Sequence, residues 1–343
     1  AIAANSEIIQ CLSNELASFG FDIKVDDFQN GHVNFYAKRG QPNVLFNVHL
    51  DTVPSSSKWS RDPFQLSVEN GNAYGLGSCD IKGAAACLLS LAQLLKDEPM
   101  ALLFSTDEEG AHGCCIKEFC NGPELAAYSQ VIVAEPTQCR AVLAHRGYMS
   151  VQGEFVGVAG HSSEPRALQD NALHKACDWT AKSLLIAEAE QSIEHGGYAG
   201  ICFNLGTITG GIKSNVIADQ ASIKWSARLR PMDDVEDWYQ RLCSLAEDAS
   251  TQWYRPFNGP PLPAAESHML RSKQFAEQFA IPIAAGVNFW TEASLFSAAG
   301  VPALVLGSGN IEQAHCADEW VSIEQLELLH DSYQRIIEGR KYV

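Results

Sequence analysis

The sequence predicts an α/β protein with a mostly parallel sheet flanked by helices and a smaller inserted α+β domain of ferredoxin-like type. Three observations support this fold class. Apolar segments expected to form strands alternate with segments of helical periodicity in residues 1–146 and 258–343, which favours a parallel sheet. Residues 147–257 instead run strand, helix, strand, strand, helix. At 343 residues, the chain is also long for one hydrophobic core, so two domains are expected.

The larger domain is predicted to contain helices at 6–19, before Gly20, and at 81–96, where apolar residues recur with helical spacing. A hairpin is expected at 68–74, because Asn70-Gly71 is a favoured turn. Short alternating or continuous apolar runs predict the remaining strands, at 22–25, 32–37, 44–48, 101–106, 130–134 and 303–306. Ligands bind at the carboxyl ends of strands in such sheets, so the residues that follow these strands are the first candidates for a site.

The middle segment is predicted to form its own domain of about 110 residues, a size that can fold around a separate core. Its expected strands and helices are 149–158, 167–187, 201–209, 221–229 and 235–249. The proline-rich stretch 256–263 is expected to be the linker back. The larger domain is therefore predicted to be split, with residues 1–146 and 258–343 in one domain and residues 147–257 inserted.

Composition narrows the class of protein. The net charge of −17, from 24 basic and 41 acidic residues, disfavours nucleic-acid binding and mildly favours cationic ligands or metal ions. No apolar run of about 18 residues predicts a membrane span, and the first residues lack the basic and apolar regions of a signal peptide. Eleven cysteines without any C-x-x-C spacing are expected to be reduced thiols in a cytoplasmic protein.

Three predicted strands end in residues that can bind metal. His49 directly follows the strand 44–48, the acids 107–109 follow 101–106, and Glu135 follows 130–134. A surface acid has no reason to recur at this position, so the coincidence indicates a ligand site at one edge of the sheet. Two further candidates are Asp80, just before the helix expected at 81–96, and His315, which follows a glycine-rich segment late in the chain.

This set of imidazoles and carboxylates is typical of a dinuclear zinc-type centre, which needs one bridging oxygen ligand and an open position for water. If Asp80 bridges, one histidine and one glutamate remain for each metal. Three carboxylates then nearly offset two dications, which leaves the site able to acidify a bound water. The candidate ligands are His49, Asp80, Glu109, Glu135 and His315.

Neighbouring acids suggest further roles. Asp51 lies two residues after His49, so in an extended segment both side chains point the same way and Asp51 can accept the imidazole N–H. Glu108 and Glu109 are adjacent and point in different directions. One can therefore bind metal while the other faces the metal-bound water as general base.

These motifs resemble those of the M20 family of metallopeptidases and deacylases, in the family's order and over nearly the whole chain. The resemblance implies that Glu108 is the base, that Glu109 and His315 hold one metal, and that His49 and Glu135 hold the other. The matching segments are His49-Leu-Asp51-Thr-Val-Pro54, Gly77-Ser-Cys-Asp80-Ile-Lys-Gly83, Asp107-Glu108-Glu109-Gly110, Ala134-Glu135-Pro136-Thr137 and Ala314-His315.

Within that family the sequence is most similar to the acetylornithine and acetylcitrulline deacetylases. In the family the inserted domain is a lid and dimerisation module. The resemblance implies that His161 reaches the neighbouring subunit's active site and stabilises the tetrahedral intermediate. It also implies that Asn215 and Arg230 hold the substrate, Arg230 by a bidentate pair with its α-carboxylate. The segments that carry this likeness are Gly160-His161-Ser, Gly210-Gly-Ile-Lys-Ser-Asn215-Val-Ile, Arg230-Pro-Met and Asn288-Phe-Trp-Thr-Glu292-Ala-Ser.

The expected activity is metal-dependent removal of acetyl from N-acetyl-L-citrulline or N-acetyl-L-ornithine in arginine biosynthesis, by a cytoplasmic homodimer with two zinc or cobalt ions. Alternatives are succinyl-diaminopimelate desuccinylase, aminoacylase or dipeptidase activity, or an inactive metal-binding homologue. Single residues also have plainer interpretations. Glu292 can meet an ornithine ammonium or hold Thr291 and its loop, His161 can be a turn residue, and Arg230 can be an ion-pair partner. Three other histidines are expected to be structural, namely His112, His145 and His174.

Overall fold

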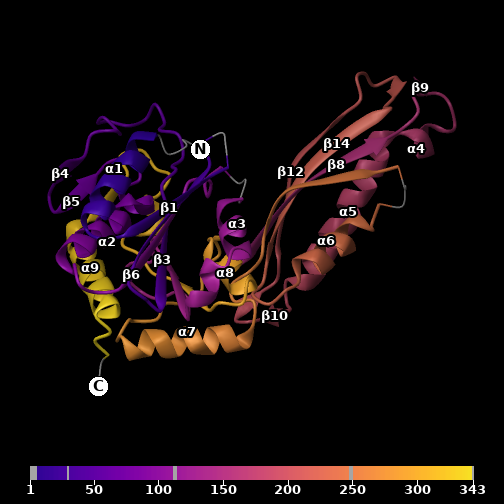
Figure 1. The fold of residues 1–343 in the computed structure, drawn as a ribbon. Helices are drawn as coiled ribbons and strands as arrows, with labels where there is room; N and C mark the ends of the chain where they lie inside the picture. The colour runs from indigo at the N-terminus through magenta and orange to yellow at the C-terminus, as the bar shows by residue number, and fades with distance from the viewer. Residues whose placement is uncertain (1–5, 29–30, 111–113, 247–249, 342–343) are drawn as a thin grey trace. The chain divides into compact units, whose positions relative to one another are not determined.

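The computed structural model describes residues 6–28, 31–110, 114–246 and 250–341 (Figure 1). The chain divides into two compact units, the first formed by residues 1–144, 263–287 and 291–343, the second by residues 145–262 and 288–290. Our proposed boundaries differ in that the second unit also takes up residues 145–146, 258–262 and 288–290. None of the described helices is long and apolar enough to cross a membrane. His112 lies outside the described residues.

The first unit is built on a six-stranded, mostly parallel sheet, as the sequence predicts. Its strand order is β1-β2-β6-β3-β7-β16. The last four strands in this order are parallel to one another, and β1 and β2 join them through antiparallel pairs. The strands are β1 (Asp22–Asp27), β2 (Val33–Arg39), β3 (Val44–His49), β6 (Met100–Ser105), β7 (Gln130–Val133) and β16 (Ala303–Val305).

Helices cover both faces of this sheet (Figure 1). On one face, α1 (Ser6–Ser18), α2 (Gly83–Leu94) and α9 (Ile323–Ile337) pack with alternate strand residues into one apolar core. On the other face lie α3 (Cys115–Asn121) and α8 (Ala293–Ala298), whose phenylalanines contact each other. A further helix, α7 (Glu266–Gln278), packs beside β16. Because helices cover both faces, the strands β3, β6, β7 and β16 are almost entirely buried, and packing fixes the positions of their ends.

A small antiparallel sheet of the first unit follows the order β17-β5-β4. The hairpin expected at 68–74 is formed by β4 (Ser67–Glu69) and β5 (Asn72–Tyr74), and β17 (Trp320–Ser322) joins it from the end of the chain. The helix expected to start at Ile81 instead starts at Gly83, because the preceding turn η1 (Ser78–Lys82) has non-helical backbone angles at Asp80 and Ile81. Asp80 is therefore part of an irregular turn.

The second unit has the order β-α-β-β-α-β, which is the ferredoxin-like arrangement. Its antiparallel sheet runs β12-β14-β8-β15, and α5 and α6 share a core with it. These elements are β8 (Gly147–Val156), α5 (Ala172–Glu190), β12 (Cys202–Gly210), β14 (Gln220–Leu229), α6 (Val235–Cys243) and β15 (Gln252–Gly259). Short pairs, β9 (Gly160–His161) with β13 (Val216–Ile217) and β10 (Glu194–His195) with β11 (Tyr198–Ala199), complete the unit.

Two predictions within this unit are wrong. The single helix expected at 167–187 is broken into α4 (Ala167–Asp170) and α5, because Asn171 leaves the helical conformation and its side chain caps α5. The linker expected at 256–263 begins as strand, since β15 continues to Gly259. Its pairing with β8 shifts register between Tyr254 and Phe257, a bulge that accommodates Pro256, which has no N–H to donate.

Candidate metal centre

Neighbouring parallel strands deliver the predicted ligands to one edge of the first unit's sheet. Strand β3 lies between β6 and β7. His49 is the last residue of β3, Glu108 and Glu109 follow β6, and Glu135 follows β7. The carboxyl ends of parallel strands meet at one edge, so these side chains converge as the sequence pattern indicated.

Asp80 connects two groups of candidate ligands. Its Oδ1 lies 3.2 Å from His49 Nε2, and its Oδ2 lies 3.1 Å from His315 Nε2. His49 Nε2 is also 3.6 Å from Glu135 Oε1, and His315 Nε2 is 2.8 Å from Glu109 Oε1. One group is therefore His49, Asp80 and Glu135, and the other is Asp80, Glu109 and His315. Each carboxylate oxygen of Asp80 faces a different group, which is the arrangement that a bridging ligand requires.

The charge of this cluster fits divalent cations. Burial and the nearby charge of Asp80 raise the pKa of Glu135 well above its usual range, and its Oε1 is buried without a hydrogen-bond partner. Burial opposes ionisation of Asp80, but hydrogen bonds with His315 and His49 lower its pKa well below the usual range. Hydrogen bonds to Asp80 and Glu109 raise the pKa of His315 to about 10. A cation would stabilise these crowded carboxylates and displace the imidazole protons.

Two further acids lie beside the ligand groups. Glu108 has a carboxylate oxygen within 4.8 Å of ligand atoms of His49 and Glu109. Its withdrawal from water, reinforced by the charge of Glu109, raises its pKa to about 8. Asp51 Oδ1 lies 3.6 Å from His49 Nδ1, while the closer partner of that nitrogen, at 3.0 Å, is the backbone oxygen of Asp51. A carbonyl can only accept, so Nδ1 carries a proton and Nε2 faces the ligands.

Asp51 has a second contact that the sequence did not suggest. Its Oδ2 accepts the backbone N–H of Glu109 at 2.9 Å. The residue therefore joins the end of β3 to the loop after β6. Through its main chain it orients one candidate ligand, His49, and through its side chain it holds the backbone of another.

Glu292 is buried beneath the strand ends, with 2% of its surface exposed. Its Oε2 accepts a hydrogen bond from Ser105 Oγ at 2.8 Å and, with the Asn47 amide turned to donate, lies 3.0 Å from that nitrogen. These partners belong to β6 and β3. These contacts favour a structural role for Glu292 over one in which its carboxylate binds a ligand's ammonium group.

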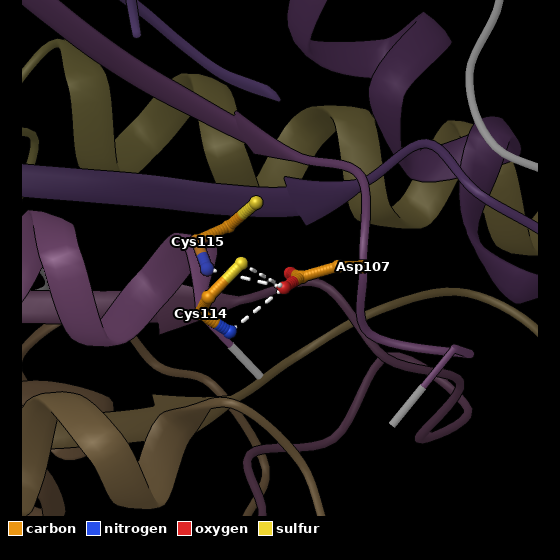
Figure 2. Close-up of side chains that lie close together, drawn as sticks. All are labelled: Asp107, Cys114 and Cys115. Carbon is orange, nitrogen blue, oxygen red and sulfur yellow. Dashed lines mark hydrogen bonds between the residues drawn. The ribbon is translucent and has the colours of Figure 1, made fainter. Parts of the chain in front are cut away.

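Asp107, which precedes Glu108, holds the start of α3 (Figure 2). Its Oδ2 accepts the backbone N–H groups of Cys114 at 2.8 Å and Cys115 at 3.1 Å, and the Cys114 thiol at 3.0 Å. Burial and the bond to Asp107 raise the pKa of Cys114 to about 11, so its thiol is neutral near pH 7. The cluster therefore caps the start of α3 through two backbone N–H groups and one thiol. All eleven cysteines are free.

The three remaining predicted residues belong to the second unit. His161, on β9, is exposed and its Nδ1 lies 2.7 Å from Ser163 Oγ. Asn215 is beside it, since its backbone oxygen accepts the N–H of Ser162 and β9 pairs with β13. Arg230 follows the far end of β14 and is buried. Its guanidinium contacts Glu190 Oε2 at 3.1 Å and Asp233 Oδ2 at 2.9 Å.

The sequence model of peptidase family M20/M25/M40 matches residues 45–339, most of the chain and all of the candidate ligands. The chain belongs to this family. The M20 family is metal-dependent, in agreement with the two ligand groups around Asp80.

Relatives within the M20 family include deacetylases. The chain is 44% identical to the N-acetyl-L-citrulline deacetylase of Xanthomonas campestris pv. campestris, covering 99% of this chain and 93% of that protein. It is 29% identical to the acetylornithine deacetylase of Edwardsiella ictaluri, with 97% and 92% covered.

Solved M20-type structures share the fold. An aminopeptidase, PepT, of Bacillus cereus superimposes with a TM-score of 0.74 at 18% identity, covering 97% of this chain and 92% of that one. An M20 family metallo-carboxypeptidase of Sulfolobus solfataricus superimposes with a TM-score of 0.73 at 16% identity, with 97% and 93% covered.

Sequence reasoning missed the residues that support the ligands. Asn47 and Ser105 hold Glu292, and Glu319 accepts hydrogen bonds from the turn of Asp80; Asp107 was noted among the acids after a strand, but its role as the cap of α3 was not. For Glu319, the sequence offers one indication of a role near the site, which is its position four residues after the candidate ligand His315. The others look like ordinary polar residues within or after strands.

Proposed function

We propose that the protein is a metal-dependent amidohydrolase that removes the acetyl group from N-acetyl-L-citrulline, with N-acetyl-L-ornithine as the second candidate, to give acetate and the free amino acid. The observation that carries this proposal is the pair of ligand groups sharing Asp80, in a chain 44% identical to an N-acetyl-L-citrulline deacetylase. The burial of Glu292 favours the neutral citrulline side chain, because the acid that could meet an ornithine ammonium is bonded to Ser105 instead.

The proposed cofactor is a pair of divalent ions, zinc or cobalt. His49 and Glu135 would hold one ion, Glu109 and His315 the other, and Asp80 both. When bound, such ions lower the pKa of water and polarise an amide carbonyl. The donor set of two imidazoles and three carboxylates, with an unpartnered oxygen on Glu135, supports this assignment.

Glu108 is proposed to move the proton. It takes a proton from water as the water oxygen attacks the acetyl carbon, and it returns the proton to the amine nitrogen as the C–N bond breaks. The products are acetate and the amino acid. Its carboxylate lies beside the ligand atoms of His49 and Glu109, so it would be a proton acceptor next to the ions' bound water. The fixed Nδ1–H of His49 keeps Nε2 directed at the ligand cluster beside Glu108.

We also propose that the second unit acts as a lid and dimerisation module. His161 would stabilise the developing oxyanion in the partner subunit's active site, with Asn215 and Arg230 as substrate contacts. The exposure of His161 on a short antiparallel pair supports a role outside its own unit. Arg230 would have to exchange its contact with Glu190 or Asp233 for the substrate carboxylate. Cytoplasmic location and a place in arginine biosynthesis remain predictions.

One kinetic panel tests the activity. Protein reconstituted with zinc or cobalt is assayed with acetylcitrulline, acetylornithine, succinyl-diaminopimelate, other N-acetyl amino acids and dipeptides, with Glu108→Gln as the inactive control. The proposal expects the highest kcat/KM with acetylcitrulline. A clear preference for another member of the panel would reassign the substrate. Bound metal without hydrolysis of any of them would favour an inactive homologue.

A further inference from the structure

Glu319 accepts three backbone hydrogen bonds from the turn that carries Asp80. Its Oε2 accepts the N–H of Gly77 at 2.7 Å, and its Oε1 accepts those of Cys79 and Asp80 at 2.9 Å each. Only 2% of Glu319 is exposed. Charge-assisted bonds of this kind are among the stronger hydrogen bonds in proteins, and here all three are directed at one turn.

The turn needs such a partner because it is not helical. Gly77 has a left-handed backbone, with φ of +81°, and Asp80 has φ of −119° and ψ of 84°. These angles direct the N–H groups of residues 77, 79 and 80 toward one point instead of into a helical ladder. Buried N–H groups without an acceptor are costly, so the carboxylate of Glu319 takes the place of the missing ladder.

Glu319 is itself held firmly. It directly precedes β17, whose Trp320 pairs with Tyr74 of β5. Its backbone oxygen accepts the N–H of Gly75 at 3.1 Å and the Ser78 hydroxyl at 3.3 Å. The main chain of Glu319 is therefore anchored by its pairing beside β5 and by Gly75 and Ser78, which fixes the position of its carboxylate.

The same segment carries His315, four residues earlier. His315 Nε2 lies 3.1 Å from Asp80 Oδ2, so the two segments meet once through candidate metal ligands and again through Glu319. We propose that Glu319 is a positioning residue of the metal centre, which holds the turn of Asp80 in register with the segment of His315. The inference rests on the proposed two-metal function. In it, Glu319 fixes the position of Asp80, the ligand that both metals would share.

The test measures zinc binding by metal-free full-length protein, in competition with a chelator, together with thermal unfolding of the metal-free forms. Glu319→Ala is expected to weaken zinc binding at both sites by about 10- to 100-fold, the effect typical of groups that orient metal ligands. Glu319→Gln should lose less, because its amide oxygen can still accept from Cys79 and Asp80 but its nitrogen cannot accept from Gly77. The matched control is Asp318→Asn, whose described contacts are to Ser60 and Arg61 and not to the turn of Asp80.

A residue with only a structural role would lower the unfolding temperature and leave the zinc affinity of the folded protein unchanged. That result for Glu319→Ala overturns the inference. If Glu319→Ala does not fold, Glu319→Gln decides: unchanged affinity overturns the inference and weakened affinity supports it. Zinc alone is the probe, so wild-type protein that binds two zinc ions but hydrolyses no acetyl amino acid contradicts the proposed function without touching the role of Glu319.

Discussion

Replacement of Asp80 by alanine tests whether one carboxylate serves two metals. Asp80 Oδ1 faces His49 at 3.2 Å and Oδ2 faces His315 at 3.1 Å, so the change removes a ligand from both groups. Glu135 belongs only to the group of His49. Glu135→Ala is therefore a matched variant that removes a buried carboxylate from one group and leaves the other complete.

The expected losses of zinc affinity follow from the number of ligand groups to which each residue belongs. Groups that merely orient a metal ligand are worth about 10- to 100-fold in affinity, so a direct ligand is expected to cost at least about 100-fold, or about 2.8 kcal/mol, for each group it belongs to. Glu135→Ala should lose about that amount, and Asp80→Ala about 5.6 kcal/mol over both groups. Zinc content after dialysis at a buffered free-zinc concentration should be two ions per chain for wild type, one for Glu135→Ala and none for Asp80→Ala.

The assignment of Asp80 as a bridging ligand is wrong if Asp80→Ala keeps one zinc ion with wild-type affinity. Thermal unfolding of the metal-free variants provides the control for folding. Asp80→Asn, which preserves the volume of the side chain, should also lose both ions, because the amide carries no charge. If only alanine has an effect, packing and not ligation explains the loss.

Further outcomes are expected at three other residues. Glu108→Gln should lower kcat by about 10²- to 10⁴-fold with two metals still bound, and near-wild-type turnover would refute its role as base. Burial and the charge of Glu108 raise the pKa of Glu292, so folding stability should fall as pH rises above about 4.3, by up to about 1.4 kcal/mol per pH unit. Glu292→Gln should therefore unfold at a higher temperature than wild type at pH 8 and at a similar one at pH 4; no gain at pH 8 would contradict this. Mixed dimers of His161→Ala and Glu108→Gln chains should regain part of the activity that each variant lacks, and recovery no better than either parent would exclude action across subunits.

The sequence was sufficient to predict that these candidate ligands lie close together, because their positions follow from chain topology. His49, Glu109 and Glu135 each occur where an apolar strand stops, and parallel strands bring such positions together whatever the details of packing. The mostly parallel sheet and its helices are confirmed for the same reason, since periodicity and strand–helix alternation are local signals. The ferredoxin-like order of the second unit was equally visible in its sequence of elements.

What failed depends on side chains that meet across long stretches of sequence. The start of α2 was misplaced because Glu319, more than 200 residues away, makes an irregular turn favourable at Asp80. The linker after the inserted domain was predicted too early. A proline-containing segment is typical of a linker, and no local pattern shows the bulge opposite β8 that accommodates Pro256 in β15. For Glu292 the sequence left two interpretations open, because its partners, Asn47 and Ser105, are ordinary strand residues that give no local signal of the contact. No local pattern encodes such contacts.

The second unit sets a constraint on any substrate-binding role for its residues. His161 lies on β9, and Asn215 directly precedes β13, which pairs with β9; Arg230 directly follows the last residue of β14. Ten residues of strand separate the two ends, which is about 30 Å and more than twice the length of an acetylated amino acid. One substrate molecule therefore cannot contact His161 and Arg230 of the same chain. If both residues act on one substrate, a second copy of the chain must supply one of them, and the mixed-dimer experiment becomes a test of the dimer as well as of His161.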